Sequence, residues 1–417
     1  MHLAPRNPFH ALRHRSFRIF FAGQFVSLVG TWMQVVAQGW LVLELTDSPF
    51  YVGLVSALGA LPILFLTLWG GVVADRVHRR RALIILQSLM LADALALGIL
   101  TATGTVTLHW VMLIAAIHGT STAFEVPIRQ AFIMEMVGRE DLMNAIALNS
   151  SNFNLTRIVG PAIAGAMIAV AGVTPCFFLN AASFLAAIGS LAAMPGEDRP
   201  AGLMTGTILA TFKEGLDYVW GREEPRALLL MTAVFSVFGF SFVPMLPVLA
   251  RDVLGTGAVG YGFLMTSVGI GASAGALAMA SWGHRFQPYR VIRAAGVGFG
   301  IALGIAAISR SWGIAAAAVG LAGFSMILNN VSSNGRLQTC APDHLRGRVM
   351  GFYVMMVLGV SPLGALQAGW VSEHLGVPAS LGVGAVACVA AVYLLSPAMR
   401  TEEPGVGGGV PLEAASN

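Results

Sequence analysis

The chain has 417 residues, of which 56% are hydrophobic and only 11% are charged; its net charge is +4 and its mean hydropathy is +0.76. Soluble domains carry about 25% charged residues, so this composition excludes a water-soluble protein and favours one that lies in lipid. The positive charge does not require a nucleic-acid partner, because the basic residues follow a membrane topology.

Apolar runs long enough to cross a bilayer, about 20 residues each, follow one another along the chain. A backbone in hydrocarbon has to satisfy its polar groups internally, so we expect each run to be a helix. A cleaved signal peptide is not expected, because the first run is too long and no small-residue cleavage site follows it. The twelve predicted spans lie near 18–43, 51–74, 82–101, 109–134, 145–171, 174–194, 226–250, 259–282, 290–308, 312–334, 347–371 and 378–398.

The basic residues predict the orientation of these spans. Arg251 and Arg310 fall in loops at one end, and Arg129, Arg157 and Arg336 fall within spans, whereas the rest of the 24 Lys and Arg residues lie at the opposite end. Loops rich in Lys and Arg stay in the cytoplasm. We therefore expect both termini to be cytoplasmic and the protein to be multi-pass in the inner membrane of a bacterial cell.

The longest connection between spans, residues 195–225, divides the spans into two sets of six. It contains apolar residues at helical spacing, which predicts an amphipathic helix on the cytoplasmic surface; these are Ile208, Phe212, Leu216 and Val219. The predicted organisation is an N-terminal half at 1–194, this linker, a C-terminal half at 226–398 and a disordered cytoplasmic tail at 399–417.

Three spans carry polar side chains spaced i, i+4, i+7, i+11, which places each set on one helix face. These are Ser27, Thr31, Gln34 and Gln38 in the first span, His118, Thr122, Glu125 and Arg129 in the fourth, and Ser325, Asn329, Ser332 and Arg336 in the tenth. The tenth-span set follows the fourth-span set by 207 residues. We interpret this offset as a parallel duplication, although any two amphipathic helices look partly alike. It predicts that Glu125 and Ser332 face each other across a central cavity.

The stretch "GGVVADRVHRRR" after the second span resembles the loop signature of the major facilitator superfamily, through Gly71, Asp75, Arg76, Arg79 and Arg80. A carboxylate at Asp75 can cap the N-terminus of a neighbouring helix, where free amides and the helix dipole favour negative charge. The resemblance implies that this neighbour is span eleven, starting near Gly347.

The resemblance also implies that Arg79 reaches an acid at the end of span four, for which Glu135 is available. Together these contacts would form a cytoplasmic latch that holds the halves together when the cavity faces outward. The alternative is that Arg76, Arg79, Arg80 and Arg81 only fix the topology, and for Arg80 and Arg81 this is the favoured interpretation.

The fifth span contains "RIVGPAIAG", which is similar to the antiporter signature of the same superfamily; the matched residues are Arg157, Gly160, Pro161 and Gly165. Segments such as "APDHLRGRVMGFY" are similar to the branch that contains the bacterial enterobactin exporter. The resemblance covers nearly the whole chain. It implies an all-α membrane protein of twelve helices in two pseudo-symmetric six-helix halves, which transports by alternating access.

Two acids lie inside predicted spans, where an ionisable residue is costly and therefore indicates a function. Glu125 lies on the polar stripe one turn from Arg129, and we predict that this pair couples transport to protons. A static ion pair is the alternative. Asp93, in span three, is interpreted as structural and is the next candidate for coupling.

The polar stripes predict the lining of the transport cavity, namely Thr31, Gln34, Gln38, His118, Thr122, Asn329, Ser332 and Arg336. Together with the phenylalanines of "VFSVFGFSF", at 234–242, these residues favour a mid-sized amphiphile as substrate. We expect a monomeric, proton-coupled exporter of a siderophore- or drug-like molecule. A proton-coupled importer of a small metabolite and a non-transporting sensor of the same fold remain alternatives.

Enzyme functions find no support in the sequence. The stretch "GASAG", at 271–275, matches the nucleophile-elbow pattern, but it falls within a span and no strand precedes it. Cys176, Cys340 and Cys388 lie too far apart for a metal site or a disulfide framework. Since no P-loop is present, ATP is not expected to drive transport, and no cofactor or metal is predicted.

Overall fold

The computed structural model describes residues 9–194, 208–342 and 344–399, and its regular elements within these ranges are helices. A short 3-10 helix, η1 (His10–Arg13), precedes the first long helix. The others are α1 (Arg15–Thr46), α2 (Pro49–Ala74), α3 (Arg79–Ala102), α4 (Leu108–Ala171), α5 (Thr174–Ala192), α6 (Ile208–Trp220), α7 (Glu223–Val234), α8 (Phe242–Val248), α9 (Gly257–Trp282), α10 (Pro288–Ile308), α11 (Trp312–Cys340), α12 (Arg346–Val354), α13 (Ser361–Leu375) and α14 (Val377–Leu395).

In the described part of the chain, eleven helical segments are long and apolar enough to cross a membrane. One of them, α4, has 64 residues and is interrupted at Gly138, whose φ of 70° is in the region that favours glycine. This residue divides α4 into two spans and raises the number of crossings to the predicted twelve.

Two of the spans are composite. The seventh runs through α7, the π-helical turns Phe235–Gly239 and Leu249–Val253, and α8 between them. The eleventh joins α12 and α13 through a third π-helical turn, Met355–Gly359. Such turns interrupt the regular α-helical hydrogen bonding and often occur near functional sites.

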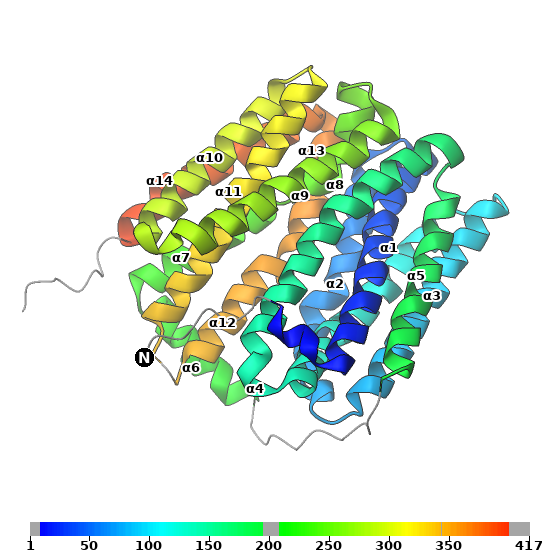
Figure 1. Cartoon of the computed structure of the whole chain (residues 1–417). Coiled ribbons are helices and arrows are strands. Elements are labelled where there is room, and N and C mark those ends of the chain that lie inside the picture. Colours follow the sequence, from blue (N-terminus) through cyan, green and yellow to red (C-terminus); the bar gives the residue numbers. More distant parts are fainter. Residues whose placement is uncertain (1–8, 195–207, 343, 400–417) are drawn as a thin grey trace, which may run out of the picture.

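The helices form two bundles, one from α1 to α5 and one from α7 to α14 (Figure 1). They meet along two helix pairs, α2 with α13 and the second span of α4 with α9. Small residues allow this close approach: a Cβ added to Gly53 would lie 2.3 Å from the Ala365 carbonyl oxygen, and one added to Gly165 would lie 2.9 Å from Cα of Gly262. Close backbone contact of this kind is how membrane helices associate.

We call the end of the bundle that carries the 47–48, 172–173 and 309–311 connections the outer end, and the opposite end the inner end. The α1–α2 turn at the outer end contains Asp47, whose φ is 52°. The inner end carries most of the basic residues and is the end predicted to be cytoplasmic.

The amphipathic helix predicted in the linker is present as α6, and it packs on the second bundle at the inner end. Val219 is buried, Asp217 is exposed, and the Tyr218 hydroxyl donates a hydrogen bond of 2.7 Å to the Cys340 carbonyl oxygen. Glu214 forms an ion pair with Arg348 of α12. The first part of the predicted linker, at 195–207, and the tail from 400 lie outside the described residues.

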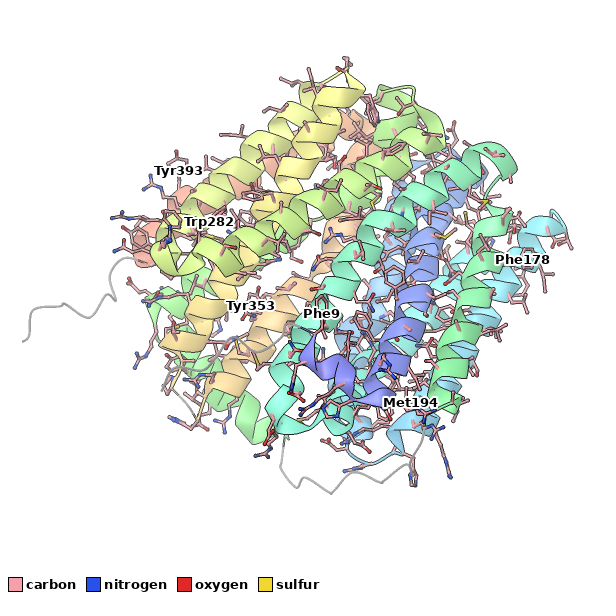
Figure 2. The ribbon with its side chains drawn as sticks, in the orientation of Figure 1. Phe9, Phe178, Met194, Trp282, Tyr353 and Tyr393 are labelled. Carbon is pink, nitrogen blue, oxygen red and sulfur yellow. The ribbon has the colours of Figure 1, made fainter. Side chains whose placement is uncertain are left out.

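Large apolar side chains cover the outside of the molecule, as expected for a surface that faces lipid. Figure 2 shows Phe178 at the edge of the first bundle and Tyr393 at the edge of the second. Tyr393 is 57% exposed, and Leu394 beside it is 78% exposed.

Candidate transport cavity

A cavity of about 330 Å³ lies between the two bundles. Its polar wall comes from α1 and α4, where Thr31, Gln34, Gln38, His118 and Thr122 line it. Its apolar wall on the second bundle is formed by Val243 and Pro244 of α8 and by Tyr261 and Met265 of α9. Pockets of this size, mostly apolar with a few placed polar groups, are typical of small-molecule sites.

Hydrogen bonds orient part of the polar wall. Gln34 is 4% exposed, and its side-chain oxygen accepts a bond of 2.7 Å from the Asn180 amide of α5. The hydroxyl groups of Thr31 and Thr122 donate to carbonyl oxygens one turn back on their own helices. The sequence alone did not indicate Asn180, because this amide is not part of a polar stripe like those of the first, fourth and tenth spans.

For three residues of α11 the structure corrects the prediction: none of them lines this cavity. The Asn329 amide donates to the Ile292 carbonyl oxygen of α10, and Ser332 contacts the Met279 sulfur of α9. Arg336 forms a bidentate ion pair with Glu224 of α7, an acid that is 1% exposed. The polar face of α11 therefore serves contacts within its own bundle.

The phenylalanines of the seventh span are also turned away from the cavity. Phe235 and Phe242 pack against Phe299 of α10, with ring centroids 5.4 and 6.1 Å away. They belong to the core of the second bundle, since both are almost fully buried.

Glu125 is buried, and its Oε1 lies 2.9 Å from Nε of Arg129 on the next turn of α4. Neither residue is among those that line the cavity. Glu125 and Ser332 both lie within the protein and away from its lipid-facing surface, at 6% and 5% exposure. The prediction that these two side chains face each other across the cavity is wrong, because the cavity is built mainly on the first bundle.

A second intramembrane acid contacts a residue that lines the cavity. Asp93 of α3 is 5% exposed, and its Oδ2 is 3.0 Å from Nδ1 of the cavity residue His118. The sequence contained both residues, but periodicity alone does not show that α3 places Asp93 behind His118.

At the outer end, contacts between the two bundles close the cavity. The Trp40 and Tyr261 rings stack with centroids 6.3 Å apart. Arg251 donates to Asp47 at 2.5 Å and to the Leu43 carbonyl oxygen at 3.3 Å.

A further outer contact links α13 to the start of α2. The Glu373 carboxylate accepts hydrogen bonds from the Ser48 hydroxyl at 2.7 Å and from the Phe50 backbone N–H at 3.2 Å. An acid of the second bundle therefore caps the N-terminus of α2, where free amides favour negative charge.

At the inner end, the residues of the predicted latch are only partly engaged. Arg79 donates to Glu135 at 3.0 Å, a contact within the first bundle. Helix α12 packs against α6, α7 and α11 of its own bundle. Among the described residues, no side chain makes a capping hydrogen bond at its N-terminus. The predicted cap by Asp75 is therefore not made in this conformation, which is closed at the outer end. Arg76 is exposed, and a Cβ added to Gly71 would meet nothing within 4 Å.

The interpretation of Arg80 as a topology signal alone is wrong. Its guanidinium donates to the Leu191 and Ala192 carbonyl oxygens, each at 2.7 Å. These carbonyls belong to the last turn of α5, where a cation is favoured by unpaired acceptors and by the helix dipole.

A family model described as a transmembrane secretion effector matches residues 6–403 of the chain. The chain belongs to this family of major facilitator transporters. Its relatives in the family are transporters and not enzymes, which agrees with the prediction that this multi-pass membrane protein is not an enzyme.

Several curated proteins are similar to this transporter over most of its length. The staphyloferrin A transporter of Staphylococcus aureus is 24% identical and covers 90% of this chain and 95% of its own length. The multidrug efflux pump Tap of Mycobacterium tuberculosis is 29% identical, with coverages of 93% and 94%. The enterobactin exporter EntS of Shigella boydii is 26% identical, with coverages of 85% and 86%.

Solved structures share the fold at low sequence identity. A bacterial homologue of the lysosomal transporter Spinster, in an inward-facing conformation, matches with a TM-score of 0.73 at 13% identity, over 93% of this chain and 97% of that one. A D-xylose–proton symporter matches with a TM-score of 0.72 at 15% identity, over 92% and 97%.

The antiporter signature of the transporter lies where its fifth span contacts two other helices. A Cβ added to Gly160 would lie 2.6 Å from the Trp32 side chain of α1, and Gly165 contacts α9. Pro161 is buried beside Gly160. The Arg157 guanidinium lies over the Trp32 ring, 5.7 Å from its centroid. The motif thus joins the packing within the first bundle to the contact between bundles.

The N-terminal segment of the transporter is held on the inner end by one buried acid. Asp141 accepts bonds of 2.8 Å from His10 and from His14, and its Oδ2 lies 2.9 Å from the Arg13 guanidinium. The hydrogen bonds from His14 and His10, together with the charge of Arg13, hold the pKa of Asp141 at about 2, although its burial acts in the opposite direction. Nothing in the spacing of these residues along the sequence indicated this cluster.

Proposed function

We propose that the protein is a proton-coupled exporter of a small amphiphilic molecule, siderophore- or drug-like, in the inner membrane of a bacterial cell. The observation that carries the proposal is the cavity between the bundles, where amide, hydroxyl and imidazole groups of α1 and α4 lie beside apolar side chains of α2 and of the second bundle. A ligand with one polar and one apolar side fits such a site.

The relatives support the outward direction. Two of them are named for export or efflux, one of enterobactin and one of multiple drugs. The third relative is named as a transporter of staphyloferrin A. Since these names cover chemically different molecules, they support a class of substrate rather than one compound.

Alternating access by the two halves, 1–194 and 226–398, is the proposed mechanism. The outer contacts through Arg251 and Glu373 hold the cavity shut on that side, and the latch at Asp75 would replace them when the cavity opens outward. Both termini are proposed to be cytoplasmic, and the protein is proposed to work as a monomer, since both halves of the cavity come from one chain.

Protons are the proposed coupling ion, and the two acids that lie inside the predicted spans are the candidates to carry them. One is Glu125 with Arg129, as the sequence predicts, and the other is Asp93 with His118. Arg129 supplies a fixed positive charge to Glu125, whereas the partner of Asp93 among the described residues is an imidazole.

The test is flux in sealed vesicles that contain the purified protein. Inside-out vesicles should accumulate ethidium when an acid-inside pH gradient is imposed, and the gradient should be lost faster with ethidium than without it. Iron-free siderophores of the catecholate class and of the hydroxycarboxylate class are the second and third probes. Uptake in the reverse sense would identify an importer, and absence of flux for every probe would favour a non-transporting sensor.

A further inference from the structure

We propose that Asp93 and His118 together form the site that binds the exchanged proton and releases it. This inference rests on the proposed proton-coupled export and assigns the residues that perform it. Of the side chains that line the cavity, His118 and Tyr261 are the ones with an ionisable group. A phenol is neutral near pH 7, whereas an imidazole changes its charge in this range.

The contact between the two residues links the cavity to a buried acid. The His118 side chain is 25% exposed at the cavity wall, and the Asp93 side chain behind it is 4% exposed. Their hydrogen bond is 3.0 Å long and joins Nδ1 to Oδ2. A proton that reaches the imidazole from the cavity can therefore pass to the carboxylate without crossing the apolar part of α3.

The other oxygen of Asp93 is the second observation. Oδ1 is buried and has no hydrogen-bond partner among the described residues. A buried, charged carboxylate with one unpaired oxygen has a high desolvation free energy. A bound proton lowers this cost, because it removes the net charge of the pair. One proton changes the net charge from −1 to 0, whether it rests on the carboxyl group or on the imidazole.

Among the described residues, no arginine or lysine forms an ion pair with Asp93, whose partner is His118. In the described segments of α1 to α5 that surround the pair, Arg79 is bound to Glu135, Arg80 to the end of α5, and Arg129 to Glu125. The charge of the pair therefore changes when the proton arrives or leaves. The other titratable or charged residues on these helices, up to Glu135, are Arg15, Arg18, Glu44, Tyr51, Arg81, His109 and Cys176.

The position of the pair beside the cavity allows a proton and a substrate molecule to be exchanged for each other. When the cavity opens outward, a proton from outside binds the pair and the substrate leaves. When the cavity opens inward, the proton leaves to the cytoplasm and a substrate takes its place against the polar wall. Because His118 belongs to that wall, proton and substrate meet the same side chain and their binding is mutually exclusive.

The first test uses ethidium as the probe in sealed vesicles. Asp93→Asn should lose ethidium transport driven by a pH gradient, yet retain exchange of internal for external ethidium without a gradient. His118→Gln should lose the gradient-driven transport as well. His109→Gln is the matched control, because His109 is an exposed histidine of the same helix. Gradient-driven transport at the wild-type rate in both Asp93→Asn and His118→Gln would overturn the inference while leaving proton-coupled export intact.

A second test needs no transported molecule. Infrared difference spectra of the protein in lipid, taken between neutral and acid pH, should contain a band for protonation of the pair. This band should be absent in Asp93→Asn, shifted in His118→Gln and unchanged in His109→Gln. An unchanged band in the first two variants would refute the assignment, and it would do so even if ethidium is not a substrate. If Asp93→Asn does not insert, His118→Gln decides both tests.

Discussion

Asp141 shows how a single side chain places a whole segment. Two histidines and an arginine of the N-terminal segment converge on its carboxylate, and the Ala11 N–H donates to the Asn144 side chain beside it at 2.8 Å. The segment is thereby fixed near Gly138, where α4 changes direction. Side-chain charge, rather than apolar packing alone, determines the position of this part of the inner end.

The pH dependence of this docking follows from the pKa of Asp141, about 2 in the folded protein against an ordinary 3.8. A depressed pKa stabilises the folded form above the ordinary value, and this stabilisation is lost as the pH falls through the folded value. A spin label at Phe9→Cys should therefore stay immobile at neutral pH and become mobile only between about pH 4 and pH 2.

Asp141→Asn should make the same label mobile at every pH, because an amide cannot replace the charge that Arg13 pairs with. Glu140→Gln, which removes the exposed acid next to it, is the control and should leave the label immobile. An immobile label in the Asp141→Asn protein would show that the cluster does not hold the segment.

Glu125 has two possible roles, proton coupling and a structural ion pair with Arg129. In its pair with Arg129, Glu125 is buried and the Arg129 side chain is 13% exposed, so removal of one partner should lower the unfolding free energy, by up to about 3–5 kcal/mol. We expect Glu125→Gln to reduce thermal stability, and Glu125→Gln combined with Arg129→Gln to recover most of it, as measured by unfolding in detergent. If Glu125→Gln is instead fully stable and has lost only gradient-driven flux, the coupling role returns to Glu125.

At the scale of the helices, the sequence predicts which faces are polar but not which neighbours they meet. The stripes of α1 and α4 were recognised from spacing alone, and Thr31, Gln34 and His118 do line the cavity. The equivalent stripe of α11 meets α9 and α10, because the polar face of a helix can satisfy itself within a bundle. Periodicity describes a helix relative to its own axis, and the partner depends on tertiary packing.

Ion pairs between residues far apart in the sequence were also predicted only in part. The pair of Arg79 with Glu135 was anticipated through a motif. The pairs of Arg336 with Glu224 and of Asp93 with His118 were not, since they join different helices with no motif to connect them. The span boundaries were predicted well because they depend only on hydrophobicity and length.

The contact of α2 with α13 gives a prediction at this scale. Gly53→Ala should push the two helices apart, because its Cβ would lie 2.3 Å from a carbonyl oxygen, and overpacking costs about 1–3 kcal/mol. The thermal unfolding midpoint in detergent should fall. Gly382→Ala is the control on α14, where an added Cβ meets nothing within 4 Å. A midpoint that does not fall in Gly53→Ala would mean that this contact is loose.

Across the whole molecule, the outer cap and the proposed inner cap have the same design in opposite directions. Glu373, at the end of α13, caps the start of α2. Asp75, at the end of α2, is predicted to cap the start of α12. Because α2 and the eleventh span are antiparallel neighbours, each can offer an acid to the N-terminus of the other. The conformation described here uses the outer cap and leaves the inner cap free.

This reciprocity predicts opposite effects of two substitutions. In a cysteine-free background with Gln38→Cys, Glu373→Ala should increase labelling by an impermeant maleimide added outside, because the outer cap is lost. Asp75→Asn should decrease this labelling and slow transport without impairing membrane insertion. Arg310→Ala is the control, since it changes another charge at the outer end, on an exposed residue of the 309–311 connection. Normal flux in Asp75→Asn would remove the inner latch from the mechanism.

The unequal walls of the cavity also bear on the energy of the conformational change. If the polar part of a ligand binds only the first bundle, its hydrogen bonds travel with that bundle as a rigid body. The second bundle then moves past the ligand with an apolar surface of its own, formed by Val243, Pro244 and Met265, whose contacts have no preferred direction. The directional bonds that break at switching are then those of the outer contacts, through Arg251 and Glu373, and not those of the ligand, so ligands of different shapes can be carried by the same movement.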